Sequence, residues 1–140
     1  MEVQVLPSVS VIITTHNRPD SLKESLAAVL KQTVMPKEVF VIDDGSSVSY
    51  EEVLSLFPRD QFTYVKVPVA SGANAARNLG ISKSTSDIIA FLDDDDVWDN
   101  DYLEQHIAEH QHADAVTCGY RFLETPGKIH INETEIITTD

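Results

Sequence analysis

Short apolar runs alternate with segments of helical periodicity along most of the chain. The runs are rich in β-branched residues and carry few charges, as is typical of strands buried on both faces of a sheet. Their ranges are 9–14, 38–42, 62–67 and 87–92. Because each run is followed by a polar break and then by a helical pattern, the chain predicts an α/β fold in which helices cover both faces of a mostly parallel sheet.

Apolar residues at helical spacing follow these runs. The stripes of the first two expected helices consist of Leu22, Leu26, Val29 and Leu30, and of Tyr50, Val53, Leu54 and Phe57. Ser21 with Glu24, and Ser49 with Glu52, have the spacing of a capping box, so we expect these serines at the two helix N-termini. Two further helices are predicted over residues 71–84 and from Asp101 onward.

The last part of the chain has a different pattern. Residues 113–124 favour an extended segment, TPGK at 125–128 favours a turn, and 128–133 favour a returning strand, so we expect a hairpin. No helical pattern follows to cover this hairpin. We therefore expect residues 1–140 to form a single domain that is the N-terminal part of a longer protein.

Composition and charge exclude several classes of function. A net charge of −13 without a cluster of Lys and Arg argues against binding to nucleic acid. Cys118 is the one cysteine, so no internal disulfide can form, which fits a reducing compartment, and its small apolar neighbours predict a buried packing residue. Because the N-terminus lacks a signal peptide and no apolar stretch approaches the ~20 residues of a membrane helix, we expect a cytoplasmic protein. Peripheral association with a membrane stays open.

Four consecutive aspartates, Asp93 to Asp96, follow the last apolar run. Along an extended segment Asp93 and Asp95 point one way, and Asp94 and Asp96 the other. Two carboxylates about 5 Å apart repel by ~3 kcal/mol at an effective dielectric constant of about 20. A divalent cation between them offsets this repulsion, and carboxylate oxygens suit Mg²⁺ or Mn²⁺. A helix cap explains one downstream aspartate such as Asp96, but not the whole run.

Polar residues also follow the other expected strands, and the carboxyl ends of parallel strands meet at one edge of a sheet. TTHN follows the first strand and DDGS the second. The carboxylate of Asp44 accepts hydrogen bonds only, so it could take the ring N–H of uracil. An Asx turn with Gly45 at positive φ explains the same residues equally well. The sequence leaves both interpretations open.

Four segments together resemble the family 2 nucleotide-sugar glycosyltransferases, which have the GT-A fold. The segments are VSVIITTHNRPDSLKESLAAVLKQT, EVFVIDDGSS, GANAARNLGI and DIIAFLDDDDVWDNDYLE, in the family's order and spacing over roughly residues 8–122. The resemblance implies a Rossmann-like GT-A sheet that binds a nucleotide-sugar donor, with a UDP-sugar favoured. It also implies metal-assisted transfer to the hydroxyl of a saccharide or other acceptor with inversion, using Mg²⁺ or Mn²⁺ as the diphosphate departs.

Individual roles follow from the resemblance, motif by motif. Thr14 lies at the base pocket, Asp44 reads the uracil ring, and Asp93 lies near the ribose. Asp95 binds the metal that bridges the diphosphate. The implied substrate-binding residues are Thr14, Thr15, Asn17, Asp44, Gly72, Arg77, Asp93 and Asp94, and the implied metal ligands are Asp93 and Asp95.

Other residues have two interpretations. His16 is more consistent with the wall of a site than with an acid or base, and Arg77 suits a solvated helix as well as a phosphate contact. Trp98 suits packing at the sheet edge or stacking on a sugar. The catalytic residue stays unassigned, because the family's general base is expected beyond residue 140 and nothing selects among the available acids, Glu124, Glu133 and Glu135.

Two alternative functions remain. A non-catalytic nucleotide-binding module would carry the same binding residues without sugar transfer. A phosphoacceptor signalling domain also gathers acids at the ends of parallel strands, but its acid pair follows the first strand, which here ends in TTHN. Stoichiometric labelling of Asp43 or Asp44 by acetyl phosphate would favour the signalling domain.

Overall fold

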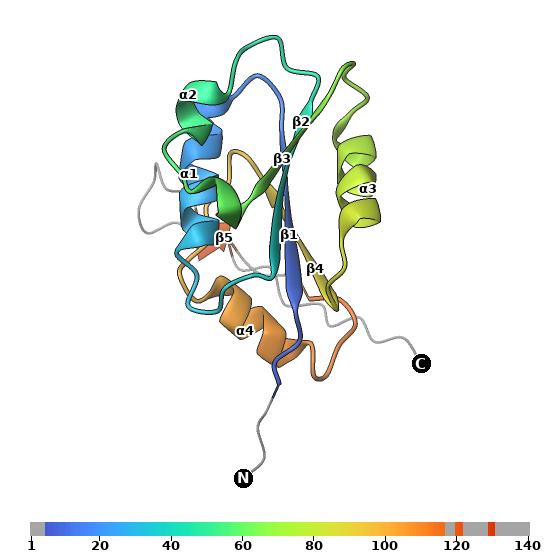
Figure 1. Cartoon of the computed structure of the whole chain (residues 1–140). Coiled ribbons are helices and arrows are strands. Elements are labelled where there is room, and N and C mark those ends of the chain that lie inside the picture. The colour runs from blue at the N-terminus through green and yellow to red at the C-terminus, as the bar shows by residue number, and fades with distance from the viewer. Residues whose placement is uncertain (1–4, 117–119, 122–128, 131–140) are drawn as a thin grey trace. The chain divides into compact units, whose positions relative to one another are not determined.

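The computed structural model describes residues 5–116, 120–121 and 129–130 (Figure 1). The chain divides into two compact units, Met1–Leu103 and Glu104–Asp140, and each is described by itself. The first unit contains a four-stranded sheet with helices, and the second contains most of the fourth α-helix and a short hairpin.

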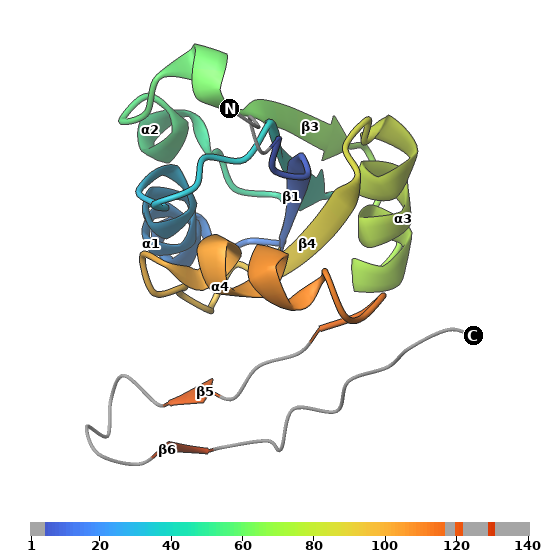
Figure 2. The ribbon, with the colours of Figure 1, turned by 90° about the horizontal axis from the view of Figure 1, so that it is seen from below.

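The sheet of the first unit is entirely parallel, with strand order β3-β2-β1-β4. Its strands are β1 (Val9–Thr15), β2 (Glu38–Asp44), β3 (Thr63–Val67) and β4 (Ile88–Asp93). Helices α1 and α2 lie on one face and α3 on the other, as Figures 1 and 2 both show. The predicted α/β class, parallel sheet and helix placement are confirmed.

The helices are close to the predicted ranges, but their starts differ. They are α1 (Pro19–Leu30), α2 (Glu51–Leu54), the 3-10 turn η1 (Arg59–Gln61), α3 (Ala73–Lys83) and α4 (Tyr102–Glu109). The capping box at Ser21 is wrong: α1 begins at Pro19, because proline has a helical φ and no N–H to satisfy in the first turn. The capping box at Ser49 is also wrong. Tyr50 precedes the short α2, and the Ser49 hydroxyl only accepts the N–H of Glu51 at 3.2 Å.

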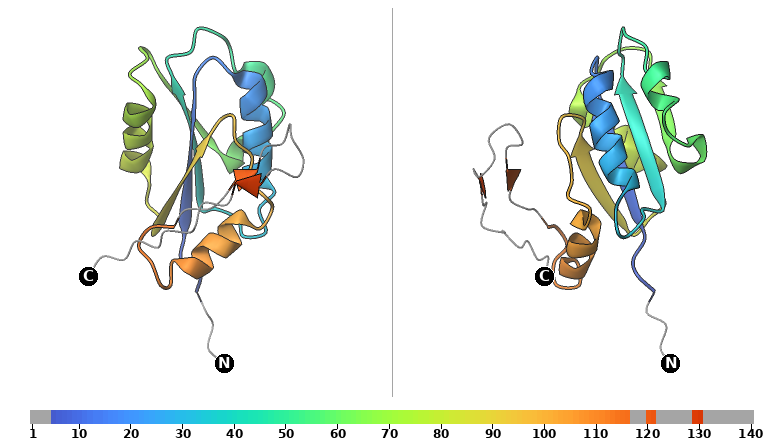
Figure 3. Two further views of the ribbon diagram at one scale, coloured as in Figure 1. Left: turned by 180° about the vertical axis from the view of Figure 1, so that it is seen from behind. Right: turned by 90° about the vertical axis from the view of Figure 1, so that its left-hand side faces the viewer.

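The core lies on both faces of β1, which is buried along its whole length. On one face the apolar stripe of α1 is buried at Leu22, Leu26 and Val29. On the other face α3 lies directly on the sheet, since a Cβ at Gly80 would come within 2.6 Å of the Ile12 side chain. Figure 3 shows the two helical layers from further directions. Burial on both faces explains why β1 reads as a continuous apolar run.

The second unit contains the hairpin that the sequence predicts. Strands β5 (Tyr120–Arg121) and β6 (Ile129–His130) pair antiparallel, with Tyr120 opposite His130. Cys118 and the three glutamates considered as bases, Glu124, Glu133 and Glu135, lie outside the described residues. Over the part of the chain that is described, every helix is too short or too polar to cross a bilayer.

Candidate functional site

The carboxyl ends of the central strands bring polar residues to one edge of the sheet. Thr14 of β1 lies opposite Ile42 of β2 on one side and opposite Asp93 of β4 on the other. Thr15 lies opposite Asp43. The register therefore places the residues that follow β1, β2 and β4 next to one another, as ligand binding at a parallel sheet requires.

The aspartates after β4 form a turn instead of an extended segment. The strand ends at Asp93, and the N–H of Asp96 donates to the carbonyl of Asp93 at 3.1 Å. From α1 the Ser25 hydroxyl lies 2.6 Å from the carbonyl of Asp96 and 2.9 Å from that of Asp94, which holds the turn. The predicted alternation is wrong for Asp96, because the turn brings its carboxylate to the side of Asp93 and Asp95.

Three carboxylates gather at this turn. One oxygen from each of Asp93, Asp95 and Asp96 lies within 4.8 Å of the others, and we call these residues the acid triad. Partial burial, followed by repulsion from Asp95 and Asp93, raises the pKa of Asp96. Three hard oxygen ligands at this spacing fit Mg²⁺ or Mn²⁺. The two predicted ligands are thus brought together, and Asp96 is a third candidate, which we had not predicted as a ligand.

Asp94 points into the protein and is fully buried. Thr15 donates its hydroxyl to one carboxylate oxygen at 2.8 Å, and the Arg18 guanidinium lies 2.5 Å from the other. Burial raises the pKa of Asp94, while the hydrogen bond from Thr15 and the charge of Arg18 oppose this rise. The Thr15 hydroxyl also meets that of Tyr50 at 2.7 Å. Asp94 therefore links the end of β4 to the end of β1. Contact between Asp94 and the nucleotide-sugar donor stays a prediction.

The two acids at the end of β2 have different partners. Asp43 accepts the N–H of Ser46 at 3.0 Å, next to Gly45 at φ 66°, so the Asx turn is formed by this residue. Asp43 is fully buried and also accepts the hydroxyl of Tyr64. Burial, and then this hydrogen bond, raise the pKa of Tyr64.

Asp44 holds the loop that precedes α3. Its two oxygens accept the N–H groups of Ser71 and Gly72 at 2.8 and 2.9 Å, which fastens the loop before α3 to the end of β2. A Cβ at Gly45 would lie 2.3 Å from the backbone nitrogen of Ala70, so only glycine permits this close approach. Each Asp44 oxygen retains a second lone pair. Recognition of a base by Asp44 stays a prediction.

Residues 16 and 17 connect the ends of β1 and β2. His16 donates from Nδ1 to the carbonyl of Asp44 at 2.7 Å. Asn17 adopts a φ of 52°, donates its N–H to the Ser46 hydroxyl and accepts the N–H of Ser47, both at 2.8 Å. Both residues are exposed at this edge, and their contact with a ligand stays a prediction.

Two arginines contact the acids. Arg77 of α3 pairs with Asp93 at 2.8 Å and also donates to Asn74, so its side chain faces the site rather than only solvent. Arg18, which sequence reasoning missed, reaches Asp94 at 2.5 Å and Asp95 at 3.4 Å. The available signal was its position between the end of β1 and the proline that begins α1.

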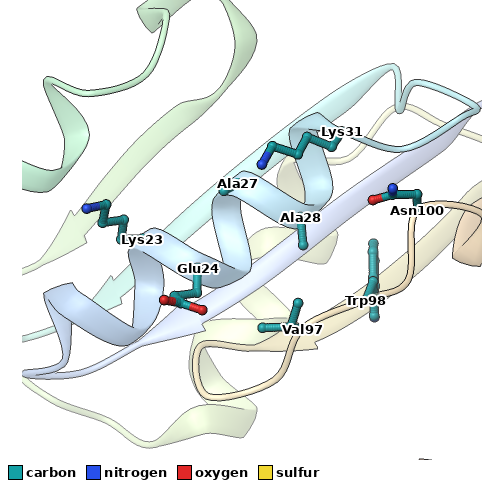
Figure 4. Close-up of a pocket in the computed structure, with 8 residues that line it drawn as sticks. All are labelled: Lys23, Glu24, Ala27, Ala28, Lys31, Val97, Trp98 and Asn100. Atoms are coloured by element: carbon teal, nitrogen blue, oxygen red, sulfur yellow. The ribbon is translucent and has the colours of Figure 1, made fainter. Parts of the chain in front are cut away.

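A separate hollow of about 360 Å³ lies between the outer face of α1 and residues 97–100 (Figure 4). Its lining consists of Lys23, Glu24, Ala27, Ala28, Lys31, Val97, Trp98 and Asn100. Trp98 is buried here and stacks on Tyr102, with ring centroids 4.2 Å apart. Trp98 therefore packs against Tyr102, while its contact with the sheet edge and its stacking on a sugar stay predictions.

The parallel sheet and the acids at its carboxyl edge match the GT-A fold. The chain belongs to glycosyl transferase family 2, whose family model matches residues 10–136. An uncharacterized glycosyltransferase, YwdF of Bacillus subtilis, is 33% identical over 108 residues, which cover 77% of this chain and 40% of that protein. An Escherichia coli protein, UDP-Glc:alpha-D-GlcNAc-diphosphoundecaprenol beta-1,3-glucosyltransferase WfgD, is 34% identical over 100 residues, covering 71% of this chain and 40% of that protein.

Solved structures agree with this assignment. TarS 1–349 of S. aureus in complex with UDP superposes with a TM-score of 0.66 at 26% identity. The match covers 75% of this chain and 32% of TarS 1–349. The chain thus spans less than half of the length of these three relatives.

Proposed function

We propose that this chain binds the nucleotide-sugar donor of a family 2 glycosyltransferase, with a UDP-sugar as the donor. The observation that carries the proposal is the acid triad, whose oxygens lie within 4.8 Å of one another at the carboxyl edge of the sheet. The family membership and the UDP-bound TarS structure support the choice of nucleotide. Residues 1–140 would form one donor-binding domain.

The acid triad would hold Mg²⁺ or Mn²⁺, which neutralises charge on the departing diphosphate when it is bound. Arg77, which pairs with Asp93 at 2.8 Å, would add a positive charge beside the diphosphate. Asp44 and the glycine-containing loop that it fastens would contact the base, with Thr14, Thr15 and Asn17 around it. Asp93 and Asp94 would border the ribose, the first by contact and the second through the residues it positions.

Sugar transfer is the second part of the proposal. An inverting displacement requires a general base to take the proton of the acceptor hydroxyl. The described residues supply no acid that we assign to this role, so the catalytic residue stays open. The name of the relative WfgD specifies a lipid-linked sugar as its acceptor. We propose that the acceptor is a saccharide at a membrane surface. The protein would lie in the cytoplasm and associate with that membrane peripherally.

Calorimetric titration with UDP tests donor binding, with and without Mn²⁺. We expect binding that depends on Mn²⁺ and is lost in the variant Asp95→Ala. Asp60→Ala is the matched control, because Asp60 is an exposed acid in η1 outside the triad. An affinity for UDP that changes neither with Mn²⁺ nor with the Asp95 substitution would contradict the proposal.

The non-catalytic alternative predicts the same titrations but no release of UDP from UDP-sugars in the presence of acceptors. The phosphoacceptor alternative is disfavoured by the structure, since Asp43 is fully buried and occupied by Tyr64 and Ser46.

A further inference from the structure

Arg18 is held at its backbone and at one end of its side chain. Its N–H donates to the hydroxyl of Tyr50 at 3.0 Å, which fixes the residue just before α1. One guanidinium nitrogen lies 2.5 Å from the buried carboxylate of Asp94. The other terminal nitrogen lies 3.4 Å from Asp95, a member of the acid triad. A single side chain therefore spans a structural acid and a predicted metal ligand.

The two contacts of Arg18 differ in strength. Asp94 has no exposed side-chain surface, so its pair with Arg18 is poorly screened, and removing the cation would leave a buried charge. Asp95 is 56% exposed, and the longer contact with it is of the kind that contributes little. The planar guanidinium offers five donors in a fixed fork, so it can leave Asp95 while keeping Asp94.

A divalent cation at the acid triad would take an oxygen of Asp95, a carboxylate whose Oδ2 lies 3.4 Å from Arg18. Two positive groups repel at such short range, so the cation and Arg18 compete for Asp95. We propose that Arg18 is an exchangeable counter-ion. It neutralises Asp95 in the ion-free chain, releases Asp95 to the divalent cation, and then directs the freed N–H groups to the diphosphate of the nucleotide. This inference rests on the proposed function.

The exchange couples the two ligands of the site. Without nucleotide, Arg18 lowers the affinity of the triad for the cation because it occupies Asp95. With nucleotide, the diphosphate gives the released guanidinium a charge-assisted partner, so cation and nucleotide bind better together than separately.

The variant Arg18→Met removes the charge and keeps most of the side-chain length. We measure Mn²⁺ affinity without nucleotide by calorimetry, and then UDP affinity at saturating Mn²⁺. Losing a weak exposed competitor should tighten Mn²⁺ binding about two- to fivefold. Losing a charge-assisted donor should weaken UDP binding by about tenfold or more.

Arg59→Met is the matched control. Arg59 is 50% exposed and pairs with Glu51 at 3.2 Å, so this variant removes the same charge from a similar surface pair outside the site. We expect it to change neither affinity. Arg18→Lys keeps a charge beside Asp94, but one ammonium cannot contact both acids. We therefore expect tighter Mn²⁺ binding and weaker UDP binding, each by a smaller factor than in Arg18→Met. Arg18→Lys decides the question if Arg18→Met does not fold.

Two results would overturn the inference. One is an affinity of Arg18→Met for Mn²⁺ that is equal to, or lower than, that of Arg59→Met. The other is UDP affinity that is unchanged by both Arg18 variants. If the unsubstituted chain fails to bind UDP at all, the proposed function fails instead, and the measurement with Mn²⁺ alone still tests the competition.

Discussion

Replacing Asp96 by asparagine tests the view that the acid triad is built for a cation. Its carboxylate oxygen lies within 4.8 Å of those of Asp93 and Asp95. Two unit charges at about this separation repel by about 0.9 kcal/mol in bulk water. Because Asp95 and Asp96 are exposed, the value for water is the better guide, and the two pairs together give about 1–2 kcal/mol before the charges of Arg77 and Arg18, paired with Asp93 and Asp95, offset part of it. Without metal, Asp96→Asn should therefore stabilise the protein at neutral pH.

The assay is urea denaturation at pH 7 in low salt, with Asp60→Asn as the matched exposed control. The gain should shrink in about 1 M salt, because screening shortens the range of the repulsion. In Mn²⁺ the order should reverse, because the unsubstituted protein binds the ion more tightly and gains more from it. A loss of stability without metal, or an equal gain in Asp60→Asn, would refute the reasoning.

The same pair of proteins has a defined dependence on pH. The pKa of Asp96 is raised in the folded state, by partial burial first and by neighbouring acids second. A carboxyl group with a raised pKa contributes stability at low pH that is lost as the pH rises through its folded-state pKa. The advantage of Asp96→Asn should therefore disappear on acidification from pH 7 to about pH 4.

Three further predictions concern the residues that support the site. Asp44→Asn should destabilise the fold by about 1–2 kcal/mol and weaken UDP binding, since two backbone N–H groups lose a charged acceptor; urea denaturation and calorimetry measure the two effects. Gly80→Ala should destabilise by about 1–3 kcal/mol, because its Cβ overlaps the Ile12 side chain; a higher melting temperature, as helix propensity alone favours, would contradict the packing. Tyr64→Phe should destabilise by about 1–3 kcal/mol, because it leaves buried Asp43 without one partner. In the unsubstituted protein, Tyr64 should ionise in ultraviolet titration only well above the ordinary tyrosine pKa, and the stability that this raised pKa contributes should be lost as the pH rises.

The two central strands follow directly from the sequence, because burial on both faces leaves a continuous apolar run, whereas the edge strands β3 and β4 are only partly buried. β1 is the clearest case, since all of its residues are buried. The helix starts were predicted less well. Serines at capping-box spacing competed with a proline that begins α1, and the preference of proline for the first helical turn prevailed.

The sequence predicted which strand ends carry the candidate site. It did not predict the roles of individual residues where those roles depend on the conformation of a turn. Strand alternation separates Asp94 and Asp96 from Asp93 and Asp95 but does not indicate which residue turns inward, and the turn after β4 decides that it is Asp94. Tyr50 fits an apolar helical stripe in the sequence, yet its hydroxyl meets Thr15 and Arg18 from distant segments. Such contacts depend on strand register, which a single sequence does not display.

The central claim is that the acid triad shares a divalent cation with a nucleoside diphosphate. A crystal structure with Mn²⁺ and UDP, measured at a wavelength where manganese scatters anomalously, tests it most directly. We expect an anomalous peak in contact with carboxylate oxygens of Asp93, Asp95 or Asp96 and with the diphosphate. Nucleotide bound with no peak at the triad, and with those carboxylates turned to solvent, would contradict it.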